Sequence, residues 1–428
     1  MSRLETLFVP EEGVESSADT IIQEALDAVR AHFGMPIAYL SEIVGAESVF
    51  RSVSAPGLED LIKPGDRRPL DAVYCQHILD GRLPELIPDT GAVPFAQTLP
   101  ITREVPIGAH VSVPIRRADG SLYGMFCCLS PEPRPSLNPR DLSIMEMFAS
   151  LSARHLNARL SAEATRRALA KTIGETLENG LFHMVFQPIF DLDGGRPTGF
   201  EALCRFDGLP YRSPDQWFRD AARIGQQSAL EAATIRAALP ILEQLPADVS
   251  LSVNASPSAV ADGAIGAALK DAPAERIVLE ITEHDRLENS DSVIRGLDRL
   301  RARGVKLAID DVGAGYSGLQ QILRLRPDIL KLDLSLTADI DTDPARRALT
   351  VGLVQFARET GAILLAEGIE RAEEAAVLRT LGVDRGQGYF LGRPARAEEA
   401  LAGLAGKSPP RGSRLGPAFT IGAEISGG

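Results

Sequence analysis

Two adjacent carboxylates, Asp310 and Asp311, stand between an apolar run and a glycine-rich segment in the stretch KLAIDDVGAGYSGLQQI, residues 306–322. The glycines form the pattern G-x-G-x-x-G, and Asp333 follows the first of them by twenty residues, as in a dinucleotide-binding turn. A pyrophosphate held by that turn would meet both carboxylates almost head-on, whereas such a turn normally follows an uncharged strand end. We therefore favour a metal site at the aspartates, with the glycines forming a flexible loop that closes near a bound ligand.

Seven further polar residues stand near the ends of other apolar runs in the same half of the chain. In chain order they are Gln187, Glu201, Asn254, Glu280, Lys331, Glu367 and Gln387. Most have apolar neighbours, which predicts burial, and an unpaired buried carboxylate is strongly unfavourable. If these residues meet at one place, cations must neutralise the carboxylates. The oxygen ligands suit Mg²⁺ or Mn²⁺ better than zinc, and the six histidines show no H-x-x-x-H or H-E-x-x-H spacing.

Each of these residues also has a structural explanation when it is taken singly. A lone glutamate is more often a surface or salt-bridged carboxylate than a ligand, a lone lysine is usually solvated, and Gln187 or Asn254 could cap a turn. The metal interpretation therefore depends on the complete set, and on a fold that gathers its members.

Eight short apolar runs that alternate with helical segments supply such a fold. The runs are HMVFQPIFDL, FEALCRF, LSVNAS, IVLEITE, KLAIDD, ILKLDL, AILLAEG and GQGYF. Eight strands alternating with helices over about 220 residues favour a closed (β/α)8 barrel of the TIM type over an open doubly wound sheet. Barrel enzymes carry their chemistry at the carboxyl ends of the strands, so the polar residues are expected to converge there.

The remaining segments predict a second domain, a connection and a tail. The first part has an amphipathic helix, two strand-like runs separated by the turn RRADG, and a helical pattern from Asp141 to Leu177, which favours an antiparallel α+β domain. The C-terminal residues are rich in Gly, Pro and Ser and lack periodicity, which predicts disorder. The expected divisions are 15–160 for the α+β domain, 161–176 for a connecting helix, 177–405 for the barrel, and 406–428 for a disordered tail.

Composition narrows the class of partner. The formal net charge of -13 disfavours duplex nucleic acid, because neutralising phosphates requires a basic face. The four cysteines show no C-x-x-C spacing, the N-terminus is too polar for a signal peptide, and no apolar run approaches the length of a membrane helix. We expect a cytoplasmic protein without a membrane partner, and a homodimer with contacts along the connecting helix.

The C-terminal half resembles the EAL-domain phosphodiesterases, which hydrolyse the second messenger cyclic di-GMP to linear pGpG. The resemblance covers about residues 177–400 and is carried by the segments FQPI, EALCRF, SVNAS, LEITE, DDVGAGYSGL, ILKLD, AEGIE and GQGYFLGRP. Val312, Gly318, Cys204 and Phe206 depart from the residues usual in that family. None of these departures removes an expected ligand.

The resemblance also implies a role for each site residue. Two divalent cations, Mg²⁺ or Mn²⁺, are implied as cofactors. The first is held by Glu201, Asn254, Glu280 and Asp310, and the second by Asp310 and Asp311 with Glu367 as a ligand or a positioning residue. Lys331 is implied to orient or polarise the attacking water, so that Lys331, Glu367 and Glu201 form the catalytic group. Contacts to the bound cyclic dinucleotide are implied for Gln187, Arg205 and Gln387, and Glu283 is implied to anchor the glycine loop.

The N-terminal part resembles a GAF sensory domain through GRLPELIPDT, IGAHVSVPI, DGSLYGMFCCLS and RDLSIMEMFASL. That resemblance implies a pocket for an unknown small molecule or signal, or a dimer module, and we expect this domain to regulate the barrel. Two alternatives from other classes remain open. One is a catalytically silent receptor for cyclic di-GMP, and the other is a dimeric signalling scaffold.

The cysteines of the N-terminal part allow two interpretations. Cys75, in the segment VYCQHIL, could be a chromophore-bearing or redox cysteine, but a buried structural thiol is favoured. Cys127 and Cys128 lie in an apolar strand and are interpreted as core residues.

Overall fold

The structure is a computed structural model that describes residues 18–208, 211–282, 290–313 and 318–406. The chain divides into two compact units, residues 1–165 and residues 166–428. This boundary falls inside a single long helix, α5 (Pro139–Asn179), which contains the helical segment expected from Asp141 to Leu177. The expected tail and the loop residue Glu283 lie outside the described residues, except for Gly406.

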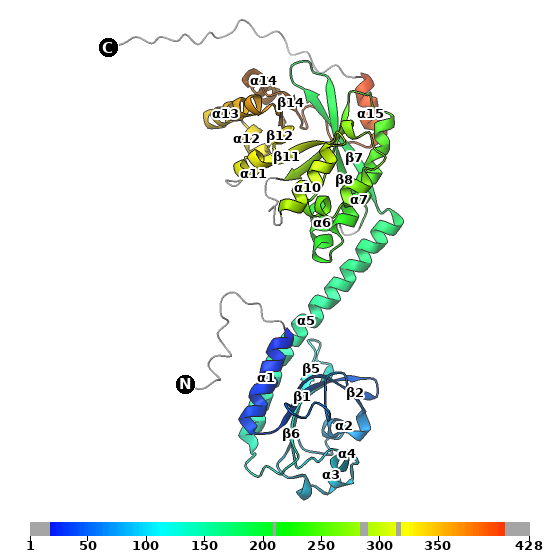
Figure 1. Cartoon of the computed structure of the whole chain (residues 1–428), viewed down its shortest axis with the longest axis vertical. Helices are drawn as coiled ribbons and strands as arrows, with labels where there is room; N and C mark the ends of the chain where they lie inside the picture. The colour runs from blue at the N-terminus through cyan, green and yellow to red at the C-terminus, as the bar shows by residue number, and fades with distance from the viewer. Residues whose placement is uncertain (1–17, 209–210, 283–289, 314–317, 407–428) are drawn as a thin grey trace, which may run out of the picture. The chain divides into compact units, whose positions relative to one another are not determined.

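The N-terminal unit contains a six-stranded sheet in the order β3-β2-β1-β6-β5-β4, in which neighbouring strands are antiparallel (Figure 1). Its strands are β1 (Ile37–Val44), β2 (Glu47–Ser54), β3 (Arg67–Pro69), β4 (Leu86–Ile87), β5 (Ala109–Arg116) and β6 (Leu122–Ser130). Its helices besides α5 are α1 (Ala18–Phe33), α2 (Tyr74–Leu79), α3 (Pro94–Thr98) and α4 (Ile101–Glu104). The predicted α+β domain with an antiparallel sheet is confirmed.

Both faces of this sheet are covered, because its central strands are apolar at consecutive positions. Phe126 and Cys128 of β6 pack in a cluster with α1 and the first turns of α5. Met125 and Cys127, which alternate with them, pack in a separate cluster with α2, α3 and α4. Successive side chains of a strand point to opposite faces, so the continuous apolar run YGMFCCLS supplies both cores.

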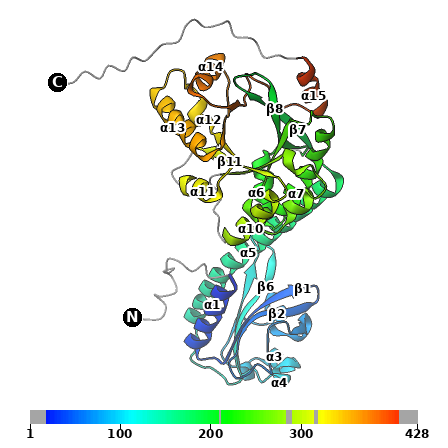
Figure 2. The same cartoon turned by 45° about the horizontal axis from the view of Figure 1, so that its top comes forward.

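The C-terminal unit contains a closed eight-stranded barrel in the order β10-β11-β12-β13-β14-β7-β8-β9, which confirms the predicted architecture (Figure 2). The strands are β7 (Phe182–Asp191), β8 (Pro197–Phe206), β9 (Ser250–Asn254), β10 (Ile277–Thr282), β11 (Lys306–Val312), β12 (Ile329–Leu332), β13 (Ile363–Ala366) and β14 (Arg385–Gly386). The helices are α6 (Pro214–Arg223), α7 (Gln227–Ala238), α8 (Pro257–Ala261), α9 (Ala264–Ala268), α10 (Ser290–Arg301), α11 (Gly318–Leu325), α12 (Leu334–Thr337), α13 (Pro344–Thr360), α14 (Ala372–Leu381) and α15 (Ala397–Gly406).

The barrel differs from an all-parallel one at β7. This strand runs antiparallel to both of its neighbours, β8 and β14, whereas the other pairings are parallel. The cause is the connection between β7 and β8, residues 192–196, which is too short for the crossover that parallel strands require. Gln187 and Glu201 therefore lie directly opposite each other in the middle of two paired strands, rather than at strand ends.

The barrel interior has an apolar layer with a polar layer next to it. Val278, Ala308, Ile329 and Leu365, together with Ile189, form a small buried cluster that is separate from the main core. Each of the four cluster residues on β10 to β13 is followed, two positions later, by a polar residue. These polar residues are, in chain order, Glu280, Asp310, Lys331 and Glu367, of which Glu367 comes just after the end of β13. Since strand side chains repeat with a period of two, these polar residues face the same interior. Within the described residues, no helix is long and apolar enough to cross a membrane.

Candidate active site

The ammonium group of Lys331 lies among four carboxylates contributed by four different segments of the barrel. Its Nζ atom is 2.7 Å from Glu280 Oε2, 2.8 Å from Glu367 Oε1, 3.1 Å from Asp310 Oδ2 and 3.8 Å from Glu201 Oε1. Lys331 has no exposed surface, and Glu280 is 2% exposed. The fold thus brings together residues that are as much as 166 positions apart in the sequence, from Glu201 to Glu367.

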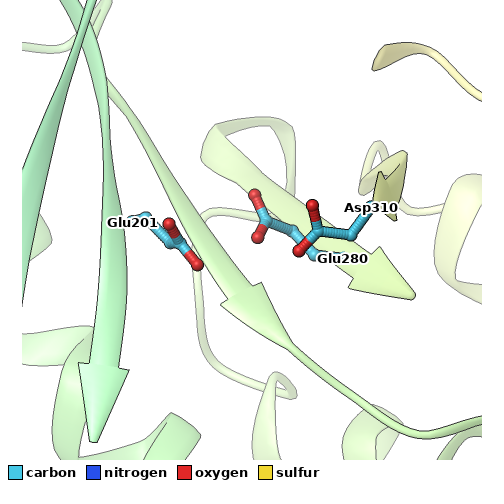
Figure 3. A group of neighbouring side chains, drawn as sticks. All are labelled: Glu201, Glu280 and Asp310. Carbon is cyan, nitrogen blue, oxygen red and sulfur yellow. The ribbon is translucent and has the colours of Figure 1, made fainter. Parts of the chain in front are cut away.

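The acidic side chains form two groups that share Asp310. In the first, one carboxylate oxygen from each of Glu201, Glu280 and Asp310 lies within 4.8 Å of the others. Figure 3 shows Glu201 facing the neighbouring pair Glu280 and Asp310. In the second group, one carboxylate oxygen from each of Asp310, Asp311 and Glu367 likewise lies within 4.8 Å of the others. Asp311 has a φ of 58°, a conformation that Asp tolerates better than most residues. It lies within β11 where the pairing with β12 shifts register between Ile309 and Val312, so the strand is irregular at this residue.

Three amide side chains hold the Glu201 end of the site. Gln387 Nε2 donates to Glu201 Oε2 at 2.6 Å and to Gln187 Oε1 at 3.0 Å, while Asn254 Nδ2 donates to Glu201 Oε1 at 3.2 Å. Gln187 Nε2 in turn donates to the backbone oxygen of Gly392 at 3.1 Å. Both oxygens of Glu201 therefore accept from fixed donors, and Gln387 Oε1 is a buried acceptor without a hydrogen-bond partner among the described residues.

Burial and like charges perturb the carboxyl groups. Burial, together with the nearby Glu201 and Asp310, raises the pKa of Glu280 to about 8 against the opposing effect of Lys331. Burial also raises the pKa of Glu367. Burial alone would lower the pKa of Lys331, but the surrounding carboxylates outweigh that effect and raise it. Lys331 is therefore a cation here.

One residue of the predicted set, Arg205, lies outside the group of hydrogen-bonded and ion-paired side chains. Arg205 lies on β8 four positions beyond Glu201, on the same face of the strand, and its Nη1 donates to the backbone oxygen of Cys204 at 2.8 Å. Arg205 as a whole residue is half-buried. Glu283 lies outside the described residues. The structure therefore gathers Gln187, Glu201, Asn254, Glu280, Asp310, Asp311, Lys331, Glu367 and Gln387.

Three supporting residues were missed by sequence reasoning. Glu231 on α7 is 6% exposed, and its Oε2 accepts from the backbone N and the Oγ of Ser256, both at 2.9 Å, just after Asn254. Buried Thr337 donates from Oγ1 to the backbone oxygen of Glu367. Glu374 accepts from the backbone N atoms of residues 370, 371 and 339. Glu231, Thr337 and Glu374 thus reach partners 25, 30 and 35 positions away, at Ser256, Glu367 and Asp339, which no local pattern identifies. The other two partners of Glu374 are local, because it is the third residue of the capping box that begins α14 at Arg371.

A further acidic group, Asp339, Asp341 and Glu374, lies on the outer segments around α12 and α14. Arg371 pairs with all three, at 3.1, 2.6 and 2.9 Å. This group already holds a protein cation with several hydrogen bonds, and we assign it a structural role in joining the two segments.

The N-terminal unit contains a largely apolar pocket between its sheet and the α2–α4 face. Residues lining it include Tyr39, Phe50, Arg68, Tyr74, Ile101 and His110. His110 is 1% exposed, burial lowers its pKa to about 4, and its Nδ1 has no hydrogen-bond partner in the part of the chain that the structure describes. The imidazole is therefore neutral at physiological pH.

Comparison with known proteins agrees with this architecture. The model of the EAL domain family matches residues 167–394, and that of the GAF domain family matches residues 17–156. The chain belongs to the EAL-domain family and carries a GAF domain before its barrel.

Relatives and solved structures share the barrel. A Pseudomonas aeruginosa protein named cyclic di-GMP phosphodiesterase PA2567 is 32% identical over 243 residues, which are 54% of this chain and 41% of that protein. Cyclic di-GMP phosphodiesterase RocR of the same organism is 31% identical over 239 residues, 51% of this chain and 58% of RocR. The chain thus spans less than two thirds of the length of either relative.

The structure entitled PaMucR phosphodiesterase, c-di-GMP complex, has a TM-score of 0.50 at 27% identity and covers 54% of this chain and 99% of that one. The EAL enzyme Bd1971, in a form bound to cAMP and cyclic-di-GMP, has a TM-score of 0.53 and covers 86% of this chain and 92% of its own. Because its identity is 21%, that second likeness shows the fold alone.

Proposed function

We propose that this chain is a metal-dependent phosphodiesterase that hydrolyses cyclic di-GMP to linear pGpG. The observation that carries the proposal is the convergence of Glu201, Glu280, Asp310 and Glu367 on buried Lys331. Membership in the EAL-domain family and the names of the phosphodiesterase relatives support the same reaction.

The residues at this site fit two divalent cations. Five carboxylates, the four around Lys331 and Asp311, and one ammonium carry a formal charge of −4 when all are ionised, which two divalent cations would cancel. The donors are carboxylate and amide oxygens, which suit Mg²⁺ or Mn²⁺. Gln387 Oε1, which has no hydrogen-bond partner within the described ranges, adds a polar acceptor at the same place.

The two acidic groups suggest how the ligands divide. We assign Glu201, Asn254, Glu280 and Asp310 to one cation, and Asp310, Asp311 and Glu367 to the other, so that Asp310 serves both. Asn254 already donates from Nδ2 to Glu201, which leaves its oxygen for the ligand role. Such cations, when bound, supply Lewis-acid stabilisation of phosphoryl charge and lower the pKa of water.

The protein's own groups position the reactants. Lys331 places three ammonium hydrogens at the centre of the site, where they can orient a water against the phosphorus. The guanidinium of Arg205 offers a planar pair of donors for two oxygens of a phosphate. Gln387 fixes the carboxylate of Glu201 by donating to it, and Gln187 holds Gln387 by accepting a second hydrogen bond from it. Water adds to one phosphodiester, the bond to a ribose 3′ oxygen breaks, and that oxygen takes up a proton to give pGpG.

We further propose that the GAF domain regulates this reaction through α5. The helix belongs to both compact units, since residues 139–165 lie in the first and 166–179 in the second. Ile173 of α5 is 1% exposed and packs with Cys204, Phe206 and Trp217 beside β8, the strand that carries Glu201 and Arg205. A shift of the helix would therefore reach the site strand directly. A homodimer in the cytoplasm remains the proposed state of the protein.

The experiment that tests the activity is incubation of the purified full chain with cyclic di-GMP and Mg²⁺ or Mn²⁺, with the products separated by chromatography. We expect pGpG, and we expect a chelator or Glu201→Gln to abolish it. Glu243→Gln, a change at an exposed glutamate, is the matched control and should retain full activity. If wild-type protein binds cyclic di-GMP and leaves it intact with either metal, the receptor function is correct instead.

A further inference from the structure

Two buried thiols of the N-terminal unit lie in one apolar cluster, on the same face of its sheet. Cys75 is on α2 and is 1% exposed, and Cys127 is on β6 and has no exposed surface. Both belong to the cluster that packs the sheet against α2 to α4. Their side chains are within hydrogen-bonding range of each other although 52 positions separate them in the sequence.

Hydroxyl groups surround this pair of sulfur atoms. Ser112 Oγ lies 3.0 Å from Cys127 Sγ, and the strand register places Tyr39 and Ser112 on the two sides of Cys127. The hydroxyl of Tyr39 is within hydrogen-bonding range of both thiols. Burial raises the pKa of Tyr39 well above its usual value, so the phenol stays protonated and can donate. A purely space-filling thiol needs no such donors.

The two thiols are also unlike each other. Hydrogen bonding from Cys127, aided by Tyr39, outweighs burial and lowers the pKa of Cys75, whereas burial raises the pKa of Cys127. Cys128 and Cys204 provide the comparison, because burial raises the pKa of each, to about 12 for Cys204. Of the four cysteines, Cys75 alone is thus shifted toward the thiolate, which is the nucleophilic form, and it has a second thiol beside it.

We propose that Cys75 and Cys127 are a redox-responsive dithiol, which a hydroperoxide such as hydrogen peroxide converts into an intramolecular disulfide that ties α2 to β6. The Cys75 sulfur attacks the peroxide, the O–O bond breaks, and Cys75 becomes a sulfenic acid with release of water. The Cys127 sulfur then displaces the sulfenic oxygen, which leaves as a second water. Two thiols are oxidised, one peroxide is reduced, and the two thiol protons leave in the two waters.

The adjoining pocket provides a path for the oxidant. Tyr39 contacts both thiols and also lines the pocket, and Tyr74, the neighbour of Cys75, lines it as well. Exposed Leu61 is part of the same lining, so the pocket reaches the surface. A small neutral peroxide can thus approach to within one side chain of the sulfur atoms.

The test uses the full chain, first reduced and then treated with hydrogen peroxide under native conditions. Excess peroxide is removed by catalase, the protein is denatured in an alkylating reagent, and its peptides are analysed by mass spectrometry. We expect the number of alkylated cysteines to fall from four to two. We also expect a cross-linked peptide pair that is lighter by two hydrogen atoms and is separated again by dithiothreitol.

Fragmentation must place the bond, because Cys127 and Cys128 are adjacent and share a tryptic peptide. Cys128→Ser is the matched control, since Cys128 is equally buried but packs on the opposite face of the sheet, and the cross-link should persist in it. Cys75→Ser should lose the cross-link. Four alkylated cysteines in treated wild-type protein, a bond to Cys128 or Cys204, or Cys75 oxidised only as a sulfinic acid would each overturn the proposal.

Discussion

At the scale of single residues, Lys331 carries the charge on which the barrel site depends. Among the described residues, its side chain is the only ammonium or guanidinium group within 4 Å of the site carboxylates of Glu201, Glu280, Asp310 and Glu367. Lys331→Met keeps much of the volume and removes the charge. Removing one partner from a buried ion pair destabilises a fold by about 3–5 kcal/mol, and partial protonation of the carboxyl groups should place the loss near the lower figure. Divalent cations should then stabilise the variant more than the wild type, because they replace the missing charge.

Thermal or urea unfolding followed by tryptophan fluorescence measures this effect, since Trp217, the one tryptophan of the chain, is buried in the barrel unit. The matched control is Lys306→Met, at an exposed lysine on the first position of β11. Equal stabilisation of wild type, control and Lys331→Met by Mn²⁺ would show that Lys331 does not occupy a cation-binding group of carboxylates.

The lowered pKa of His110 predicts how the stability of the GAF domain depends on pH. Burial lowers its pKa from 6.5 to about 4, so between these values the unfolded state binds more protons than the folded state. The contribution of His110 to stability is therefore complete above pH 6.5 and is lost progressively as the pH falls toward 4. The loss is at most about 3 kcal/mol.

Hydrogen exchange of β5 and β6, corrected for intrinsic rates, gives the free energy of opening at each pH. His110→Phe should flatten its dependence between pH 6.5 and 4, and His32→Phe, at an exposed histidine, should leave it unchanged. The same slope in wild type and His110→Phe would mean that His110 is not the group that titrates.

At the scale of elements, Glu231 joins α7 to the segment between β9 and α8. Its carboxylate accepts from Ser256 N and Ser256 Oγ, two residues beyond Asn254. Glu231→Gln and Ser256→Ala should each weaken cation binding without touching the cations, and a double-mutant cycle should show coupling of about 1–2 kcal/mol. The readout is the Mn²⁺ concentration for half-maximal turnover, with Glu243→Gln as the control. Additive effects of the two changes would argue against this positioning role.

The polar set of the barrel could be predicted from sequence because it has a simple physical origin. Glu280, Asp310 and Lys331 each stand two positions after an apolar interior residue, so a period of two places them in one layer. Supporting contacts could not be predicted in this way. Glu231 and Ser256 are 25 positions apart and meet only because α7 packs beside β9.

The direction of β7 could have been predicted but was not. A hydrophobic run gives no direction for its strand, and the alternation of strands and helices favoured parallel pairing throughout. The segment LDGGR between β7 and β8 already limited them to a hairpin. The last strand is also shorter than the predicted run GQGYF, residues 386–390. β14 ends at Gly386, so Gln387 follows the strand and does not lie within it.

At the scale of the whole molecule, α5 determines where the chain can be divided. Ile173 and Leu177 pack with Phe206 and Trp217 of the barrel unit, so a cut close to them would open that cluster. A chain that begins at Arg166, the first residue of the second compact unit, retains about two helical turns before Ile173. We expect it to fold, to unfold with the same tryptophan signal as the full chain, and to keep the complete site.

If the GAF domain regulates the barrel, this shortened chain and the full chain should differ in kcat for cyclic di-GMP by severalfold, and peroxide should alter only the full chain. Protein concentration must be varied in both, with mass in solution measured alongside, because loss of the first unit also removes any dimer contacts that it makes. Equal turnover at every concentration, with and without oxidant, would restrict the GAF domain to a role outside catalysis. If the difference in kcat between the two chains depends only on the fraction of dimer in solution, dimer formation is the cause of the regulation. The shortened chain retains every residue placed at the site, so the loss of a site residue could not explain that difference.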